Sequence, residues 1–274
     1  MTDAYSRLIV EHDGDFQQVT VNRPGDRNSI DSRLMDEIIQ MLDKAETTDA
    51  RVVVFSGAGN TYFIGGADGI EMMQCDPDSA GTFSKKIQDL FNRMEASPLI
   101  LVAAIDGLCF GGGFEFALAC DFRIATATSR IGLPEVKVGL IPGGGGTQRL
   151  PRLVGTGKAM QMILSGKLYP GKEAYQEGLI HLCVPENELA SACRDFMTPF
   201  LKRPQHALSQ AKLAVKSSQN NDFSKGLRAE TAAFRHCFEK PFFRQLMCRQ
   251  LEGGDLETTV EMPAGLCSEK KEEA

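Results

Sequence analysis

Two short runs of almost entirely apolar residues limit what this chain can fold into. They are 51–55, which is dominated by valine, and 99–105. A strand that is apolar on both sides is typical of a parallel sheet covered on both faces. Segments with apolar residues at helical spacing separate these runs, for instance Leu34, Ile38 and Leu42. The alternation of strand and helix predicts an α/β fold.

The remaining elements follow from turn signals and periodicity. We expect two strands within residues 7–22, a helix from about residue 31 capped by Asp31 or Ser32, helices at 83–95 and 111–120, and a strand at 122–126. From about residue 155 the pattern is mostly helical. The chain is therefore divided into a core of residues 1–195 and a helical C-terminal region, 196–274, which ends in a flexible tail of about twenty residues.

Composition excludes several classes of protein. The formal net charge of -6 argues against nucleic acid as the main partner, because phosphate binding needs a basic surface. The longest apolar run, 99–105, is far shorter than the roughly 20 residues that cross a bilayer. The eight cysteines form no C-x-x-C pair and the four histidines show no metal-ligand spacing. We expect a soluble, cytoplasmic protein with free thiols, no membrane contact and no metal.

Glycine clusters mark three loops. The run 143–146 is not a P-loop, because no Lys-Ser/Thr pair follows at the required spacing. The clusters 64–68 and 109–113 each follow a strand, and small residues there let a ligand approach main-chain N–H groups. Two N–H groups that converge on one point form an oxyanion hole. Tight turns and strand–helix packing explain the same glycines equally well from spacing alone.

Two glutamates lie close to these loops. Glu115 falls in the first turn of an apolar helix, where a carboxylate is buried at a cost and its pKa rises. Glu135 follows Pro134 and precedes another apolar stretch. Two acids beside one oxyanion hole suit proton transfer next to a carbonyl. Ordinary acids at a helix start or a turn are the alternative reading.

At these residues the chain resembles a known family. Segments 63–68, 107–121 and 132–150 resemble the signature segments of the crotonase superfamily, the enoyl-CoA hydratase/isomerase family, and the third has the hydratase form. Val21–Pro24 and Asn28 also fit, and the resemblance covers roughly residues 7–220. It implies a crotonase-like spiral of ββα units with a helical C-terminal trimerisation region, assembled as a homotrimer or homohexamer. It also implies an acyl-CoA thioester substrate and no cofactor or metal.

The resemblance implies roles for individual residues as well. Glu115 and Glu135 match the two catalytic glutamates of hydratases, and the backbone N–H groups of Ala67 and Gly112 match the oxyanion hole. The substrate-binding positions that it implies are Arg27, Asn28, Ile64, Gly65 and Asp68. Arg23 and Arg27 are candidates for holding the phosphates of coenzyme A, or else are ordinary solvated side chains.

The leading prediction is an enoyl-CoA hydratase, a hydro-lyase that adds water across the 2,3 double bond of a 2-enoyl-CoA or removes it. An isomerase needs only one carboxylate, so the glutamate pair favours hydration. Isomerase, decarboxylase or hydrolase chemistry on acyl-CoA is the alternative within the family. A non-catalytic RNA-binding or scaffold protein is the alternative from another class. The sequence does not identify the acyl chain, the pathway or the direction.

Overall fold

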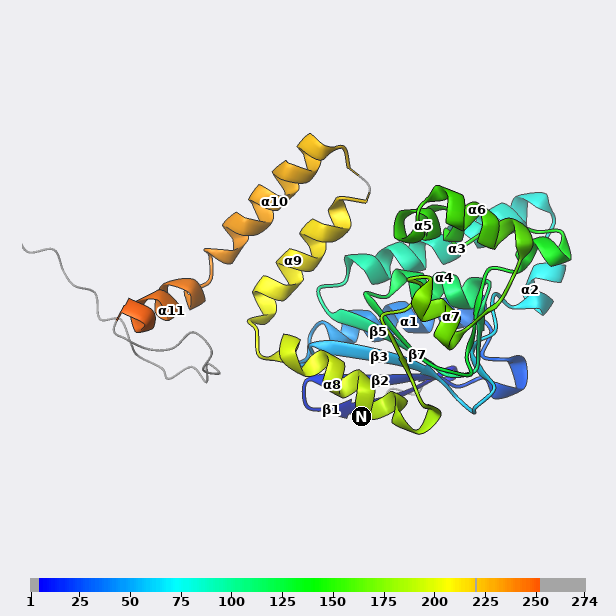
Figure 1. Cartoon of the computed structure of the whole chain (residues 1–274), viewed down its shortest axis with the longest axis horizontal. Coiled ribbons are helices and arrows are strands. Elements are labelled where there is room, and N and C mark those ends of the chain that lie inside the picture. The colour runs from blue at the N-terminus through cyan, green and yellow to red at the C-terminus, as the bar shows by residue number, and fades with distance from the viewer. Residues whose placement is uncertain (1–4, 220, 252–274) are drawn as a thin grey trace, which may run out of the picture. The chain divides into compact units, whose positions relative to one another are not determined.

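The computed structural model describes residues 5–219 and 221–251. The larger sheet is built from β1 (Leu8–Asp13), β2 (Phe16–Val21), β3 (Val52–Gly57), β5 (Ile100–Ile105), β7 (Phe122–Thr126) and β10 (Leu182–Val184). These strands lie in the order β1-β2-β3-β5-β7-β10 (Figure 1). The hairpin β1-β2 is antiparallel, and the other neighbouring strands pair in parallel. The predicted parallel α/β sheet is confirmed.

A second, smaller sheet accompanies the first. Its strands are β4 (Tyr62–Ile64), β6 (Leu108–Phe110), β8 (Arg130–Gly132) and β9 (Tyr169–Pro170), in that order. Each of β3, β5 and β7 is followed by one short strand of this sheet and then by helix, which is the repeating ββα unit of the expected spiral. The expectation of loops at 64–68 and 109–113 is wrong for Ile64, which ends β4, and for Cys109 and Phe110, which belong to β6, while β8 and β9 were not predicted. Strands of two or three residues are too short to show a period, and their hydrogen-bonding partners come from distant segments.

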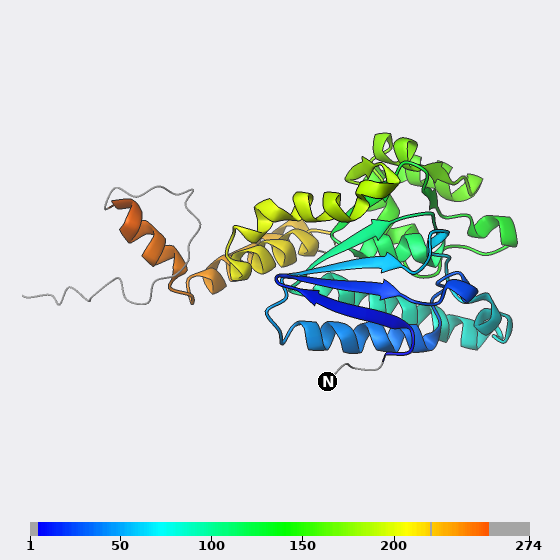
Figure 2. The same cartoon turned by 90° about the horizontal axis from the view of Figure 1, so that it is seen from below.

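The helices fill the connections. They are α1 (Ser32–Ala45), α2 (Gly69–Met73), α3 (Pro77–Ala96), α4 (Gly112–Ala119), α5 (Gly146–Val154), α6 (Thr156–Ser165), α7 (Gly171–Gln176), α8 (Leu189–Leu201), α9 (Gln205–Ser217), α10 (Phe223–Cys237) and α11 (Phe242–Leu251). Three 3-10 helices are η1 (Pro24–Asp26), η2 (Glu135–Val138) and η3 (Glu186–Glu188). Asp31 caps α1 as predicted, because its side chain accepts from the N–H of Leu34 at 2.7 Å. Figure 2 shows α1 along one face of the larger sheet.

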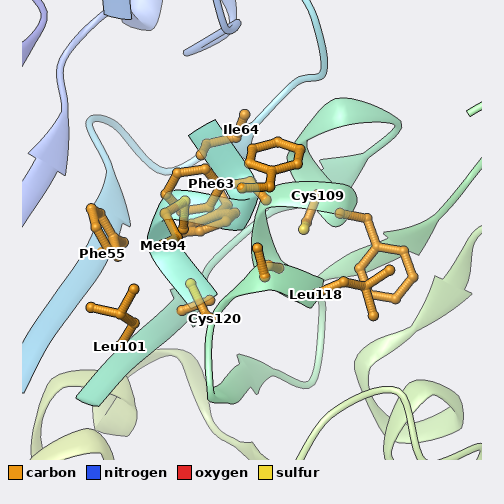
Figure 3. Close-up of a cluster of buried hydrophobic side chains, with 14 of the residues drawn as sticks. Phe55, Phe63, Ile64, Met94, Leu101, Cys109, Leu118 and Cys120 are labelled. Carbon is orange, nitrogen blue, oxygen red and sulfur yellow. The ribbon is translucent and has the colours of Figure 1, made fainter. Parts of the chain in front are cut away.

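The aromatic core surrounds α4. The Phe116 ring meets Phe55, Phe63 and Phe91 edge to face, at centroid distances of 5.0, 6.2 and 6.0 Å. Figure 3 shows Phe55 and Phe63 in this cluster. All eight residues of α4 are buried. Because strands β3 and β4 and helix α3 all contribute to the cluster, α4 is fixed from several sides.

The chain divides into two compact units, residues 1–197 and 198–274. The first holds both sheets and the aromatic core. The described part of the second consists of helices, among which α9 and α10 pack against each other. The expected flexible tail lies outside the described residues. No helix in 5–219 or 221–251 has the length and apolarity needed to cross a membrane.

Candidate active site

Glu115 lies in the first turn of α4 and is 2% exposed. Its Oε1 atom accepts two backbone hydrogen bonds, from the N–H of Gly144 at 2.8 Å and the N–H of Gly146 at 2.7 Å. The close approach requires glycine, because a Cβ on Gly144 would lie 2.8 Å from Glu115 Oε2. The glycine run 143–146 therefore holds a carboxylate of the protein itself.

Two opposing effects act on the Glu115 carboxyl. Burial raises its pKa, while the N–H groups of Gly146 and Gly144 and the positive charge of Arg149 act in the other direction. Burial is the larger effect, so the pKa lies above the usual value for glutamate. Glu115 is thus a buried acid with three groups arranged to stabilise its negative charge.

Glu135 is the first residue of η2, directly after Pro134. Its Oε2 atom is buried and has no hydrogen-bond partner among the residues that the structure describes. Burial raises the pKa of Glu135 to about 7; the Glu115 carboxylate adds to this rise, and the backbone N–H of Glu135 opposes it. A Cβ on Gly111 would lie 3.4 Å from Glu135 Oε1, so this carboxyl reaches the N-terminal end of α4. The fold thereby brings both glutamates to one place.

Ala67 and Gly112 also meet at this point. A Cβ on Gly112 would lie 2.9 Å from the backbone nitrogen of Ala67. Ile30 bonds to the residues on either side of Ala67, donating to the carbonyl of Gly66 and accepting from the N–H of Asp68. In this parallel bridge the N–H of Ala67 points away from Ile30.

Within 5–219 and 221–251, neither the N–H of Ala67 nor the N–H of Gly112 has an acceptor. Gly112 is also the first residue of α4, where the helix dipole adds positive potential. Two adjacent unsatisfied N–H groups at a helix N-terminus are suited to bind an oxygen that gains negative charge.

The neighbouring residues Arg27 and Asn28 have side chains in different surroundings, one exposed and the other buried. Both residues adopt the left-handed conformation, with φ of 58° and 53°. Arg27 is exposed, and its carbonyl accepts from the N–H of Gly65 at 2.9 Å. Asn28 is fully buried: its Oδ1 accepts from the N–H of Arg23, and its Nδ2 donates to the carbonyls of Ala58 and Tyr62. Asn28 thus fixes the loop, and the Arg27 side chain extends into solvent.

Other predicted substrate-binding residues have structural contacts. Ile64 is fully buried, so neither its side chain nor its backbone is open to a ligand, whereas Gly65 is half-buried. Asp68 caps α2 by accepting from the N–H groups of Ile70 and Glu71. Burial acts to raise the pKa of Asp68, but its hydrogen bonds and the charge of Arg23 outweigh burial and lower it.

Arg23 differs from both readings that the sequence offered. It is 8% exposed and forms ion pairs with Asp26, Asp31 and Asp68 at 3.0–3.2 Å. A guanidinium surrounded by three carboxylates is neither a solvated side chain nor available to a phosphate. The acids that enclose it are partly distant in sequence, which is why the pattern did not reveal this cluster.

Gly144, Gly146 and Arg149 also belong to the surroundings of Glu115, and the sequence pattern did not reveal these contacts. The glycine run itself was visible, but its partner lies on α4, about thirty residues earlier in the chain. No group of three or more His, Cys, Asp or Glu side chains that could hold a metal ion occurs in the described ranges.

The chain is similar to known proteins along most of its length. The sequence pattern of the family described as "Enoyl-CoA hydratase/isomerase" matches residues 11–256, and the chain belongs to that family. It is 32% identical over 253 residues to a short-chain-enoyl-CoA hydratase of Clostridium acetobutylicum, covering 92% of this chain and 97% of that one. It is 35% identical over 233 residues to the human mitochondrial methylglutaconyl-CoA hydratase, covering 83% and 69% of the two chains.

Solved structures show the same fold. The crystal structure of an enoyl-CoA hydratase from Bacillus anthracis superposes with a TM-score of 0.84 at 30% sequence identity. The match covers 90% of this chain and 96% of that one. The expected crotonase-type fold is therefore confirmed.

Proposed function

We propose that this chain is an enoyl-CoA hydratase, which adds water across the 2,3 double bond of a 2-enoyl-CoA thioester or catalyses the reverse dehydration. One observation carries the proposal. Two carboxyls with different surroundings, the buried Glu115 and the half-buried Glu135, lie beside two unsatisfied backbone N–H groups. Paired acids whose environments differ are suited to act as base and acid in one reaction.

The surroundings assign the two roles. Glu115 has the Gly144 and Gly146 N–H groups to stabilise its charge, so it is the base that takes a proton from water as the water oxygen bonds to Cβ. Glu135 has a pKa of about 7 and is the acid that delivers a proton to Cα. The N–H groups of Ala67 and Gly112 would stabilise the negative charge that develops on the thioester oxygen.

Arg27 is the residue best suited to hold the nucleotide end of coenzyme A. It is exposed, and no ion pair engages it within the described residues. Arg23, by contrast, is committed to three carboxylates. The half-buried backbone of Gly65, two residues before Ala67, is proposed to contact the same substrate.

The chemistry needs no cofactor and no metal, in our proposal. Proton transfer between water, two carboxyls and the substrate is redox-neutral, and the two backbone N–H groups supply the electrostatic stabilisation. The cytoplasmic location stays a prediction from the sequence.

A panel of 2-enoyl-CoA thioesters with short, long and branched chains tests the proposal. Turnover is followed by loss of the conjugated thioester absorbance, before and after dialysis against a chelator, with Glu115→Gln alongside. We expect turnover by the dialysed wild-type protein and its loss in the variant. CoA-ester binding without hydration would favour isomerase, decarboxylase or hydrolase chemistry, and absence of binding would favour a scaffold or RNA-binding protein.

The pH dependence follows from the pKa of Glu135. In hydration the protonated acid is required, so kcat/KM is expected to fall by about tenfold per pH unit above pH 7. Dehydration starts from the same singly protonated pair, with the proton on Glu115, and the overall reaction takes up no net proton, so kcat/KM for dehydration is expected to fall above pH 7 as well. Initial rates in both directions between pH 5.5 and 9 check this, and a kcat/KM that does not fall above pH 7 would contradict it.

We also propose that the chain assembles as a homotrimer or homohexamer through its helical unit. One face of α10 carries large apolar side chains that are 44–82% exposed, followed by another on α11. They are Phe223, Leu227, Phe234, Phe238 and Phe243. Apolar surface of this extent is typical of protein–protein contacts.

Light scattering tests the assembly. The wild-type protein is expected to have the mass of a trimer or hexamer, and Phe234→Asp is expected to lower that mass by placing a charge in the apolar face. Arg228→Asp on the same helix serves as a control for the charge change. A monomeric wild-type protein would refute the proposed assembly.

A further inference from the structure

A polar row on α3 faces the glycine run that holds Glu115. Ser84, Gln88, Asn92 and Glu95 recur at helical spacing and therefore share one face of the helix. The first two bind the same acceptor: Ser84 Oγ donates to the carbonyl of Gly143 at 2.7 Å, and Gln88 Nε2 donates to it at 2.8 Å. The loop is thus fixed at its first residue from outside the site.

Arg149 fixes the next residue of the loop. Its Nη1 donates to the carbonyl of Gly144 at 2.9 Å. Its Nε and Nη2 donate to the two carboxylate oxygens of Glu95 at 3.1 and 3.0 Å, and Nη2 also reaches Asn92 at 2.8 Å. The two side chains are only 12% and 17% exposed. A forked pair of this kind is directional as well as strong, and lysine cannot reproduce it.

These contacts and the contacts of Glu115 involve the same short loop. The carbonyl of Gly144 binds Arg149, and the N–H of that same residue binds Glu115. The adjoining Gly145 has φ of +102° and N-caps α5, and Gly146 supplies the second N–H to the carboxylate. Displacement of the Gly144 carbonyl therefore displaces a hydrogen bond to the catalytic carboxyl.

We propose that Arg149, held by Glu95, is a positioning residue that orients the glycine run 143–146 and keeps Glu115 the proton acceptor while Glu135 remains the donor. The assignment rests on the hydratase function proposed above. Arg149 contacts the carbonyl of Gly144, so it acts on Glu115 through the loop backbone and through its positive charge.

The charges around Glu115 support this role. Glu135 on η2 raises the cost of a second negative charge nearby, and Arg149 on α5 is the cation that acts on the Glu115 carboxyl. Glu95 on α3 partly neutralises that cation while anchoring it. Loss of Arg149 would remove one of the groups that make the pKa of Glu115 differ from that of Glu135. Two acids that interact and have similar pKa values titrate as a coupled pair.

The test compares Arg149→Met, Arg149→Lys and Glu95→Gln with a matched control, Arg93→Met. Arg93, on α3, forms ion pairs with Asp43 and Glu46 but does not contact the glycine run. One readout is kcat and KM for the preferred enoyl-CoA. The other readout is the pH at which Glu115 is half ionised, measured by infrared difference spectroscopy. The carboxyl band of Glu115 is identified as the band that disappears in Glu115→Gln.

In Arg149→Met we expect kcat to fall about ten- to a hundredfold with little change in KM, and the Glu115 midpoint to move to higher pH. Arg149→Lys retains the positive charge, so the Glu115 midpoint is expected to lie close to the wild-type value. Its kcat is expected to lie between those of Arg149→Met and the wild-type protein. Glu95→Gln removes the carboxylate that holds Arg149 but keeps the positive charge of Arg149. We therefore expect kcat to fall and the Glu115 midpoint not to rise. Arg93→Met should keep both wild-type values.

An unmoved midpoint or an unchanged kcat in Arg149→Met overturns the proposal. If that variant does not fold, Arg149→Lys is judged by the same two readouts against the control. A wild-type protein without hydratase activity would refute the function proposed above and remove the kinetic readout. The infrared midpoint would still decide whether Arg149 controls the ionisation of Glu115.

Discussion

Replacement of Glu135 by glutamine is expected to lower kcat for hydration by about 10²- to 10⁴-fold, because glutamine cannot deliver a proton to Cα. The side chain has nearly the same shape, so substrate binding and KM should change little. Steady-state kinetics at pH 7 measure both constants. The pH dependence assigned to Glu135 should disappear from the residual activity.

Glu135→Gln lowers activity but is expected to raise the stability of the fold at high pH. Burial raises the pKa of Glu135 to about 7, so the wild-type protein loses folding free energy as the pH rises from about 4.5 to 7, and the neutral glutamine avoids this loss. Below about pH 4.5 the carboxyl is protonated in both the folded and the unfolded state, and the difference vanishes. Denaturation midpoints at pH 5 and pH 8.5 should show a much larger gain for Glu135→Gln at the higher pH. Loss of activity together with a lowered midpoint at pH 8.5 would contradict this account.

Gly112→Ala is expected to lower kcat by about 10²- to 10³-fold through damage to the oxyanion hole. The added Cβ would lie 2.9 Å from the Ala67 nitrogen and 3.3 Å from the Gly66 carbonyl carbon, both of them backbone atoms. The two N–H groups must therefore separate, and they can no longer converge on one oxygen. The glutamates keep their contacts, so the defect should resemble loss of transition-state stabilisation.

Gly81→Ala is the matched control for this substitution. Gly81 lies inside α3, where an added Cβ meets nothing within 4 Å. Alanine there favours the helix by about 0.5–1 kcal/mol and should leave kcat unchanged. Wild-type kcat in Gly112→Ala, or an equal loss in the control, would exclude Ala67 and Gly112 as the oxyanion hole.

Local patterns in the sequence were sufficient for the large strands and for the buried helix that carries Glu115. The apolar runs became β3 and β5, the capped helix begins after Asp31, and Glu115 lies in a buried helix. The short strands β4, β6 and β8 were missed, since each depends on neighbours supplied by the next turn of the spiral. Periodicity is a property of a segment, whereas the pairing of three-residue strands is a property of the whole fold.

The residues by themselves predicted which groups carry the proposed chemistry: a carboxyl in an apolar helix, a second one after a proline, and glycines after two strands. Only the tertiary structure decided which of the predicted residues are buried, which are exposed and which hydrogen-bond partners each of them has. It buried Asn28 and Arg23 as structural residues, left Arg27 exposed, and directed the Gly144 and Gly146 N–H groups to Glu115 alone. The reason is physical, because the pKa and direction of a side chain depend on burial and on partners that are distant in sequence.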